Sequence, residues 1–128
     1  MTEQSNLILI VDDEPDMGWA LEHLLNSQGF VTQKALSSQE ALNLMEQHQF
    51  ACAFLDAKLP DMDGLELAGQ MRQLDPDIKI VMVSGYFYRD DISIQNAISQ
   101  RLIIDFISKP FLQEEILSAL KVSLKNSF

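Results

Sequence analysis

Cysteine, basic residues and long hydrophobic runs are all scarce in this sequence, and each scarcity excludes a class of protein. Cys52 is the single cysteine among 128 residues, which excludes an internal disulfide, and there is no CxxC pair that could bind zinc or exchange thiols. The longest early apolar run, Leu7–Val11, is too short for a membrane span or a signal peptide, and no basic segment precedes it. We therefore expect a cytoplasmic protein that does not contact a membrane.

Positive charge is sparse. The chain has 9 Lys and Arg against 19 Asp and Glu, which gives a formal net charge of −10. Nucleic-acid backbones bind clustered Lys and Arg, so we expect no direct nucleic-acid contact by this domain. No repeat and no Pro-, Gly- or Ser-rich linker divides the chain. The length suits one domain over residues 1–128, with its core at about 6–125.

Short apolar runs alternate with segments of helical period along the chain. Strands are expected at Leu7–Val11, Val31–Ala35, Ala51–Leu55, Ile78–Val83 and Ile103–Ile107. Helices are expected at Asp16–Ser27, from Ser37 or Ser38 onward, and at Leu65–Leu74, Ile92–Gln100 and Leu112–Lys125. Continuous apolar strands are typical of sheets covered on both faces. The alternation therefore predicts an α/β fold, with helices on both faces of a five-stranded parallel sheet.

Polar residues stand at the carboxyl ends of four of these strands. Asp12 and Asp13 follow the first strand, Asp56 follows the third, Ser84 follows the fourth, and Lys109 comes shortly after the fifth. Open parallel sheets bind ligands beyond the carboxyl ends of their strands. We therefore expect these five side chains to gather at one edge of the sheet.

This mixture of residue types suits phosphoryl transfer. Three carboxylates in one pocket repel one another unless a hard cation such as Mg²⁺ or Mn²⁺ offsets their charge, and Lys109 supplies a second positive charge. Asp56 fits the role of a nucleophile that forms an acyl phosphate, and Ser84 can donate a hydrogen bond to a phosphoryl oxygen. The alternative for Asp12 or Asp13 is a simple cap on the following helix.

Three segments carry a family resemblance. Ile8–Pro15, Asp56–Gly64 and Asp105–Phe111 are similar to segments of bacterial response-regulator receiver domains, and the likeness extends over about residues 6–125. It implies a flavodoxin-like (βα)5 fold in a two-component phosphorelay. It also implies a histidine kinase or histidine phosphotransfer protein as phosphodonor and an output domain or effector protein, and it allows a homodimer. The domain would be a signalling module that catalyses its own phosphotransfer and slow autodephosphorylation.

The resemblance assigns roles to the acidic residues. Asp56 would accept the phosphoryl group. Asp13, Asp56 and the backbone carbonyl of Lys58 would ligate Mg²⁺, and Asp12 would hold a metal-bound water.

It also implies how a signal leaves the site. Ser84 would be the switch hydroxyl, Lys109 the partner of the phosphoryl group, and Phe106 the switch aromatic. Pro110 would follow a cis peptide bond that aims the lysine. Phosphorylation would repack the face formed by the fourth helix, fifth strand and fifth helix. Ordinary strand core is an equal and compatible role for Phe106.

Two stretches depart from the family pattern. Gly85–Ile92 is slightly long and contains the run Tyr86, Phe87 and Tyr88, which suits either local packing over the next helix or a partner or dimer contact. Ser99–Ile104 lacks the glycine that relatives commonly place before the fifth strand.

Two residues are expected at the rim of the pocket. Lys58 lies two positions after Asp56 and is a candidate to alter the lifetime of the phosphoryl group, while Tyr86 lies two positions after Ser84 and is a candidate to shield the pocket. Solvated rim residues are the alternative for both.

Other functions make different demands on the sequence. A pseudo-receiver need not retain the acids, hydroxyl and lysine that this chain has, and an FMN-binding flavodoxin-like protein needs a Ser/Thr/Gly-rich phosphate loop after the first strand. An aspartate phosphatase needs an Asp-x-Asp pair after a strand, whereas Asp61 and Asp63 follow a turn proline. His23 and His48 lack partners at metal-ligand spacing, and Trp19 is typical of core filling or an exposed helix face.

Overall fold

The computed structural model describes residues 6–87 and 90–124, and strands and helices alternate throughout them. The strands are β1 (Leu7–Val11), β2 (Val31–Ala35), β3 (Cys52–Leu55), β4 (Lys79–Ser84) and β5 (Asp105–Ser108). The helices are α1 (Pro15–Ser27), α2 (Ser38–Gln47), α3 (Gly64–Leu74), α4 (Ile92–Ser99) and α5 (Gln113–Leu124). Among these residues no helix is both long and apolar enough to cross a membrane.

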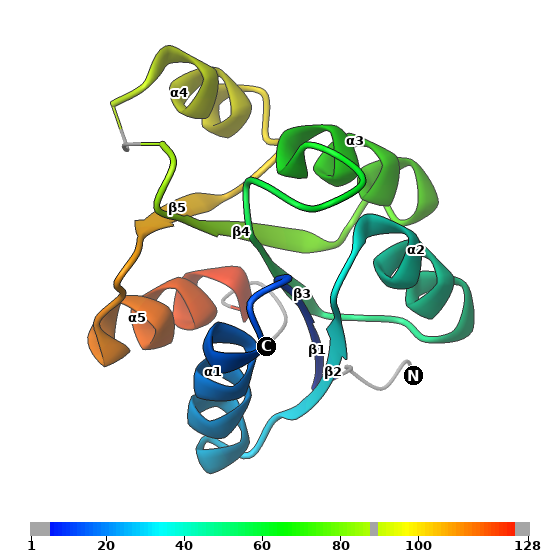
Figure 1. Cartoon of the computed structure of the whole chain (residues 1–128), viewed down its shortest axis with the longest axis vertical. Coiled ribbons are helices and arrows are strands. Elements are labelled where there is room, and N and C mark those ends of the chain that lie inside the picture. Colours follow the sequence, from blue (N-terminus) through cyan, green and yellow to red (C-terminus); the bar gives the residue numbers. More distant parts are fainter. Residues whose placement is uncertain (1–5, 88–89, 125–128) are drawn as a thin grey trace.

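The five strands form one parallel sheet in the order β2-β1-β3-β4-β5, which confirms the predicted fold class. Figure 1 shows α1 and α5 on one face of the sheet and α2 and α3 on the other. After β1 the chain crosses to one face, and after β3 it crosses to the opposite face. The carboxyl ends of β1 and β3 therefore flank the point where the winding reverses, which is where open sheets bind ligands.

Two hydrophobic cores hold the helices against the sheet. Side chains alternate along β1, so Leu9 and Val11 pack in the cluster that includes residues of α2, α3 and α4, whereas Ile8 and Ile10 face α1 and α5. Burial on both faces explains why β1, β3 and most of β4 are continuous apolar runs rather than alternating ones.

The expected element ends are mostly within one residue of the observed ones, but β5 begins two residues later than predicted. The backbone N–H groups of Leu102 and Ile103 both donate to the carbonyl of Ala97, at 2.9 and 3.3 Å. Ile103 is fully buried, yet its amide serves the end of α4 instead of the sheet. The predicted last residue of α5, Lys125, lies outside the described residues.

Two helix ends use a left-handed residue. Gly29 has φ +90° just past α1, as the predicted helix stop requires. After α4 the same region is occupied by Arg101 with φ 61°. The stretch Ser99–Ile104, which lacks the glycine expected from the family resemblance, thus places a non-glycine residue in a backbone conformation that favours glycine.

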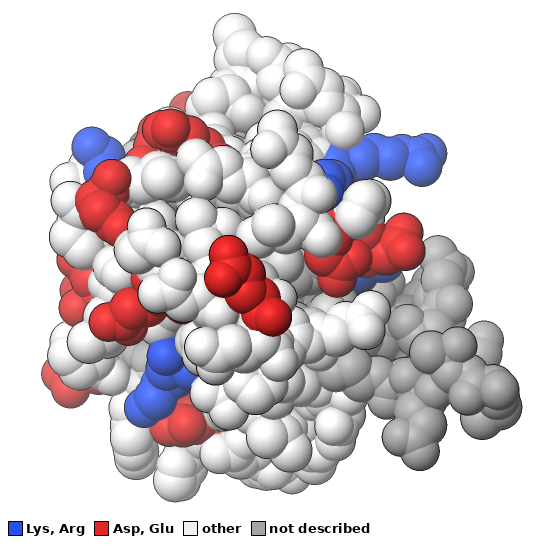
Figure 2. All heavy atoms as spheres, turned by 90° about the vertical axis from the view of Figure 1, so that its right-hand side faces the viewer, with Lys and Arg blue, Asp and Glu red and all other residues white. Residues whose placement is uncertain are grey.

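Figure 2 shows one face of the molecule on which acidic and basic side chains are interspersed, and the basic ones form no continuous patch there.

Candidate functional site

The buried carboxylates Asp12 and Asp56 continue the sheet by one residue beyond β1 and β3. The N–H of Asp56 donates to the carbonyl of Val11 at 2.9 Å, and the N–H of Asp12 donates to the carbonyl of Ala35 at 3.1 Å. Only 4% of Asp12 and 7% of Asp56 is exposed. The sheet itself therefore fixes both residues at its carboxyl edge.

Three of the predicted site residues form an acidic cluster. Asp12, Asp13 and Asp56 each offer a carboxylate oxygen, and these three oxygens lie within 4.8 Å of one another. Asp12 Oδ1 accepts a hydrogen bond from the N–H of Glu14 at 2.9 Å, while Glu14 itself occupies the cap position of α1 and makes no side-chain cap bond. A convergent set of oxygen donors of this kind fits a hard divalent cation such as Mg²⁺.

Lys109 compensates part of this negative charge. Its Nζ lies 2.9 Å from Asp12 Oδ2, 2.9 Å from Glu14 Oε1 and 3.4 Å from Asp56 Oδ2. Burial disfavours the ammonium, but hydrogen bonds to Glu14 and Asp12 and the charges of Asp12 and Asp56 outweigh it and raise the pKa of Lys109. The Lys109–Pro110 peptide bond is cis, as predicted. Sequence reasoning assigned no role to Glu14, although it directly follows the two aspartates.

Opposing electrostatic effects act on the pKa of the Asp56 carboxyl group. Desolvation by burial raises its pKa above the ordinary value of 3.8, and the charge of Asp12 adds to this. The charge and hydrogen bond of Lys109 and the backbone N–H of Lys58 act in the opposite direction, but the net pKa is raised. The negative charge on Asp56 is thus only partly compensated by the protein, which is the situation that a bound cation relieves.

Ser84 and Phe106 occupy neighbouring strands beside the acids. Ser84 is fully buried at the end of β4, and its Oγ accepts a hydrogen bond from the N–H of Tyr86 at 2.9 Å. Phe106 pairs with Met82 across the sheet and is 1% exposed. Phe106 belongs to the cluster that contains Ile94 and Ala97 of α4, so it is a core residue on the face of the sheet that α4 covers.

Gly64 positions the loop that follows Asp56. Its N–H donates to the carbonyl of Ala57 at 2.7 Å. A Cβ atom at this position would lie 2.8 Å from Ala57 Cα and closer still to the carbonyl oxygen of Asp56. The backbone of α3 therefore approaches the acceptor loop so closely that only glycine fits, a contact that the sequence showed only as turn chemistry.

Lys58 and Tyr86 lie at the rim of the same hollow. This hollow of about 560 Å³ is lined by Asp13, Glu14, Asp56, Lys58, Gly85, Tyr86 and Lys109. Lys58 Nζ lies 4.7 Å from the centroid of the Tyr86 ring. The aromatic run divides: Tyr86 is 66% exposed, Phe87 packs against the core, and Tyr88 lies outside the described residues.

Other acids and histidines of the sequence have structural roles. Asp61 accepts hydrogen bonds from the N–H groups of Ser38 and Gln39 at the start of α2, and Asp63 accepts from Leu65 at the start of α3. Both carboxylates thus hold the first turns of helices. His23 stacks on the exposed Trp19, and His48 is also exposed.

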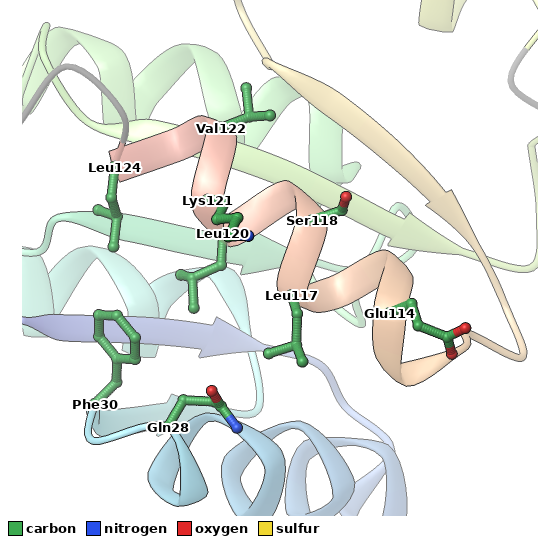
Figure 3. Close-up of a pocket in the computed structure, with 9 residues that line it drawn as sticks. All are labelled: Gln28, Phe30, Glu114, Leu117, Ser118, Leu120, Lys121, Val122 and Leu124. Atoms are coloured by element: carbon green, nitrogen blue, oxygen red, sulfur yellow. The ribbon is translucent and has the colours of Figure 1, made fainter.

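A larger hollow of about 800 Å³ lies between α5 and the end of α1. Figure 3 shows Leu117, Leu120 and Leu124 of α5 directed toward Phe30 and Gln28. Its lining combines apolar side chains with scattered polar ones and includes none of the clustered acids, so the charged site, and not this larger hollow, is the place for chemistry.

Comparison with known proteins agrees with this geometry. A family model described as the response regulator receiver domain matches residues 8–121. The response regulator protein TodT of Pseudomonas putida is 31% identical over 125 residues, which are 98% of this chain and 54% of TodT. The chain thus spans about half the length of that relative.

Two solved structures have the same fold. A CheY-like receiver domain protein from Methanospirillum hungatei superposes with a TM-score of 0.87 at 29% identity, covering 96% of both chains. The response regulator TrrA from Thermotoga maritima, solved in complex with Mg²⁺ and BeF, gives a TM-score of 0.80 at 30% identity over 92% of this chain and 98% of TrrA.

Proposed function

The chain belongs to the response regulator receiver domains, the phosphoryl-accepting modules of two-component signalling, and we propose that its acceptor is Asp56. The observation that carries this proposal is the setting of the Asp56 carboxylate. It is buried at a strand end, lies beside two further carboxylates, and has a lysine ammonium 3.4 Å away. Such a group can attack phosphorus and form an acyl phosphate once its charge is offset.

The residues that would hold Mg²⁺ or Mn²⁺ are Asp13, Asp56 and the backbone carbonyl of Lys58, with Asp12 holding a metal-bound water. The bound cation would neutralise charge that develops on the transferring phosphoryl group. The chain's own residues supply the remaining contacts to the phosphoryl oxygens. Lys109 pairs with one phosphoryl oxygen and leaves its contact with Asp56, while the Ser84 hydroxyl donates its proton in a hydrogen bond to another.

The switch starts from the bond that Ser84 already makes. Its Oγ accepts from the N–H of Tyr86, so its own hydroxyl proton is available for a new acceptor. Movement of Ser84 toward a phosphoryl group on Asp56 frees space beside Phe106 and changes its packing on α4. The face of α4, β5 and α5 is then what a partner reads.

The proposed partners follow from membership of the receiver-domain family. The donor is a histidine kinase or a histidine phosphotransfer protein, and the reader is an output domain, an effector protein or a second copy of the chain. The site of action is the cytoplasm. The domain slowly hydrolyses its own acyl phosphate.

The decisive experiment is incubation with Mg²⁺ and acetyl phosphate, followed by intact mass measurement. We expect one added phosphoryl group in the wild type and none in Asp56→Asn. No adduct, together with no spectral change on adding beryllofluoride, would contradict the proposal and favour a pseudo-receiver that acts through contact alone.

A further inference from the structure

The outer side of α5 carries a row of exposed side chains that takes no part in the acceptor site. Glu114, Ser118 and Lys121 follow one another at spacings of four and three residues, so they lie in one row along the helix (Figure 3). All three line the hollow between α5 and the end of α1. Half-buried Leu117 and Val122, which is 58% exposed, flank the row on its two sides. The row therefore presents charge at its ends and apolar surface along its edges.

The two charged ends of this row have opposite signs. Among residues 6–87 and 90–124, neither Glu114 nor Lys121 has a partner in an ion pair. The neighbouring Glu115 differs, because its carboxylate accepts a hydrogen bond from the N–H of Leu112 at 2.8 Å. The helix thus holds one acid and one base, about 10 Å apart along its axis, that the described part of the chain does not neutralise.

The order of the residues makes the row complementary to a second copy of itself. Two copies of one helix can lie antiparallel about a twofold axis that passes between positions 117 and 118. Position 114 of each copy then faces position 121 of the other, and position 117 faces position 118. Glu114 would meet Lys121 of the other copy at both ends of the pair, and Leu117 would lie against the small Ser118 at its centre.

We propose that the outer face of α5, formed by Glu114, Leu117, Ser118, Lys121 and Val122, binds a second copy of this chain in a symmetric antiparallel helix pair. None of these residues lines the acceptor hollow, so the contact requires no phosphoryl group. One helix pair buries less surface than the roughly 1,200–2,000 Å² of a stable interface. The dimer is therefore weak and reversible, with a Kd of about 10–500 µM.

The net charge of the chain sets the conditions of the test. Each copy carries a formal charge of −10, so two copies repel one another at low salt. At an ionic strength of about 0.15 M, charges separated by more than about 8 Å are largely screened, and the contacts within the helix pair decide the association. Sedimentation velocity over a dilution series measures the Kd under these conditions.

Charge reversal at the two ends tests the arrangement of the pair. In Glu114→Lys a lysine faces a lysine at both ends, and in Lys121→Glu a glutamate faces a glutamate. Each variant alone should have a Kd at least about tenfold higher than wild type, because two ion pairs change from attraction to repulsion. An equal mixture of the two variants should form a heterodimer with a Kd near that of wild type, since every lysine then faces a glutamate again.

Matched controls separate this local contact from the overall charge. Glu114→Lys changes the net charge from −10 to −8, which by itself favours association, so a weaker dimer must result from the contact. Glu66→Lys makes the same change in the first turn of α3, on the opposite face of the sheet, and should keep the wild-type Kd (Figure 1). Asp56→Asn should also keep it. Circular dichroism checks that every variant is folded.

Four results would overturn the proposal. The first is a wild type that stays monomeric up to about 1 mM. The second is a dimer whose Kd is unchanged by both reversals, which would place the contact on another surface. The third is a mixture of the two reversed variants that stays monomeric although both are folded. The fourth is a Glu66→Lys variant that dissociates as readily as Glu114→Lys.

Discussion

Substituting alanine at two glycines of α3 should change stability in opposite directions. At Gly64 the new Cβ would meet Ala57 Cα at 2.8 Å and the carbonyl of Asp56, whereas at Gly69 it would meet no atom within 4 Å. Gly64 does not have a positive φ, so the cost at this position is one of space alone. Backbone atoms cannot rotate away as a side chain can, so the acceptor loop itself must move.

The magnitudes follow from this difference. Overpacking against backbone costs about 1–3 kcal/mol of unfolding free energy, so Gly64→Ala should be destabilising by that amount. Gly69 lies inside the helix, where alanine is more stable than glycine by about 0.5–1 kcal/mol, so Gly69→Ala should be stabilising. For a domain of this length, about 1 kcal/mol corresponds to a Tm shift of roughly 3–5 °C.

Urea denaturation of both variants, followed by circular dichroism, measures these changes. The rate of phosphorylation by acetyl phosphate should fall in Gly64→Ala, because the displaced loop carries Asp56, and remain unchanged in Gly69→Ala. A Gly64→Ala variant whose unfolding free energy is equal to or above that of wild type would refute the close approach of α3 to the acceptor loop.

Three further predictions concern Arg101, Asp56 and Arg72. Arg101→Gly should raise the unfolding free energy by about 0.5–1 kcal/mol, because Arg101 has the left-handed φ of 61° that favours glycine. Gln100→Gly, at φ −83°, should lower the unfolding free energy, and an increase in both variants would contradict the role of φ. In the presence of a chelator, Asp56→Asn should be more stable than wild type at pH 7. Burial raises the pKa of Asp56, so its ionisation favours the unfolded chain as the pH rises above 3.8. The difference in unfolding free energy should vanish below about pH 4, and urea titrations across pH that show no such convergence would count against this reasoning. Arg72→Met should lose about 2–4 kcal/mol in the same denaturation assay, because the guanidinium donates to the carbonyls of Pro76, Ile78 and Leu102, and a loss below 1 kcal/mol would show that these bonds contribute little.

Most of the fold could be predicted because each element is specified by its own residues. Buried parallel strands are continuous apolar runs such as Leu7–Val11, and Gly29 marks the end of α1. The start of β5 could not be predicted in this way. Ile103 has the composition of a strand residue, but its amide is taken by Ala97 across the end of α4. That competition depends on the path of the chain and not on local pattern.

The site likewise has a part that the sequence predicts and a part that it does not. Asp12, Asp56 and Ser84 directly follow or end strands, and a parallel sheet brings such positions to one edge whatever the loops do. The contact of Glu14 with Lys109 and the closeness of Gly64 to Asp56 depend on how far side chains reach and how loops turn. These features depend on the three-dimensional path of the chain, since no spacing in the sequence encodes them.

The contact between Lys58 and Tyr86 lies between these two cases. Leu55, the last residue of β3, pairs with Met82 of β4, and the chain leaves these neighbouring strands three residues before Lys58 and, after Ser84, two residues before Tyr86. The amides of both residues then serve Asp56 and Ser84, which brings their side chains together above the pocket. The cation and the aromatic ring are therefore in contact only because the two strands are adjacent and in this register.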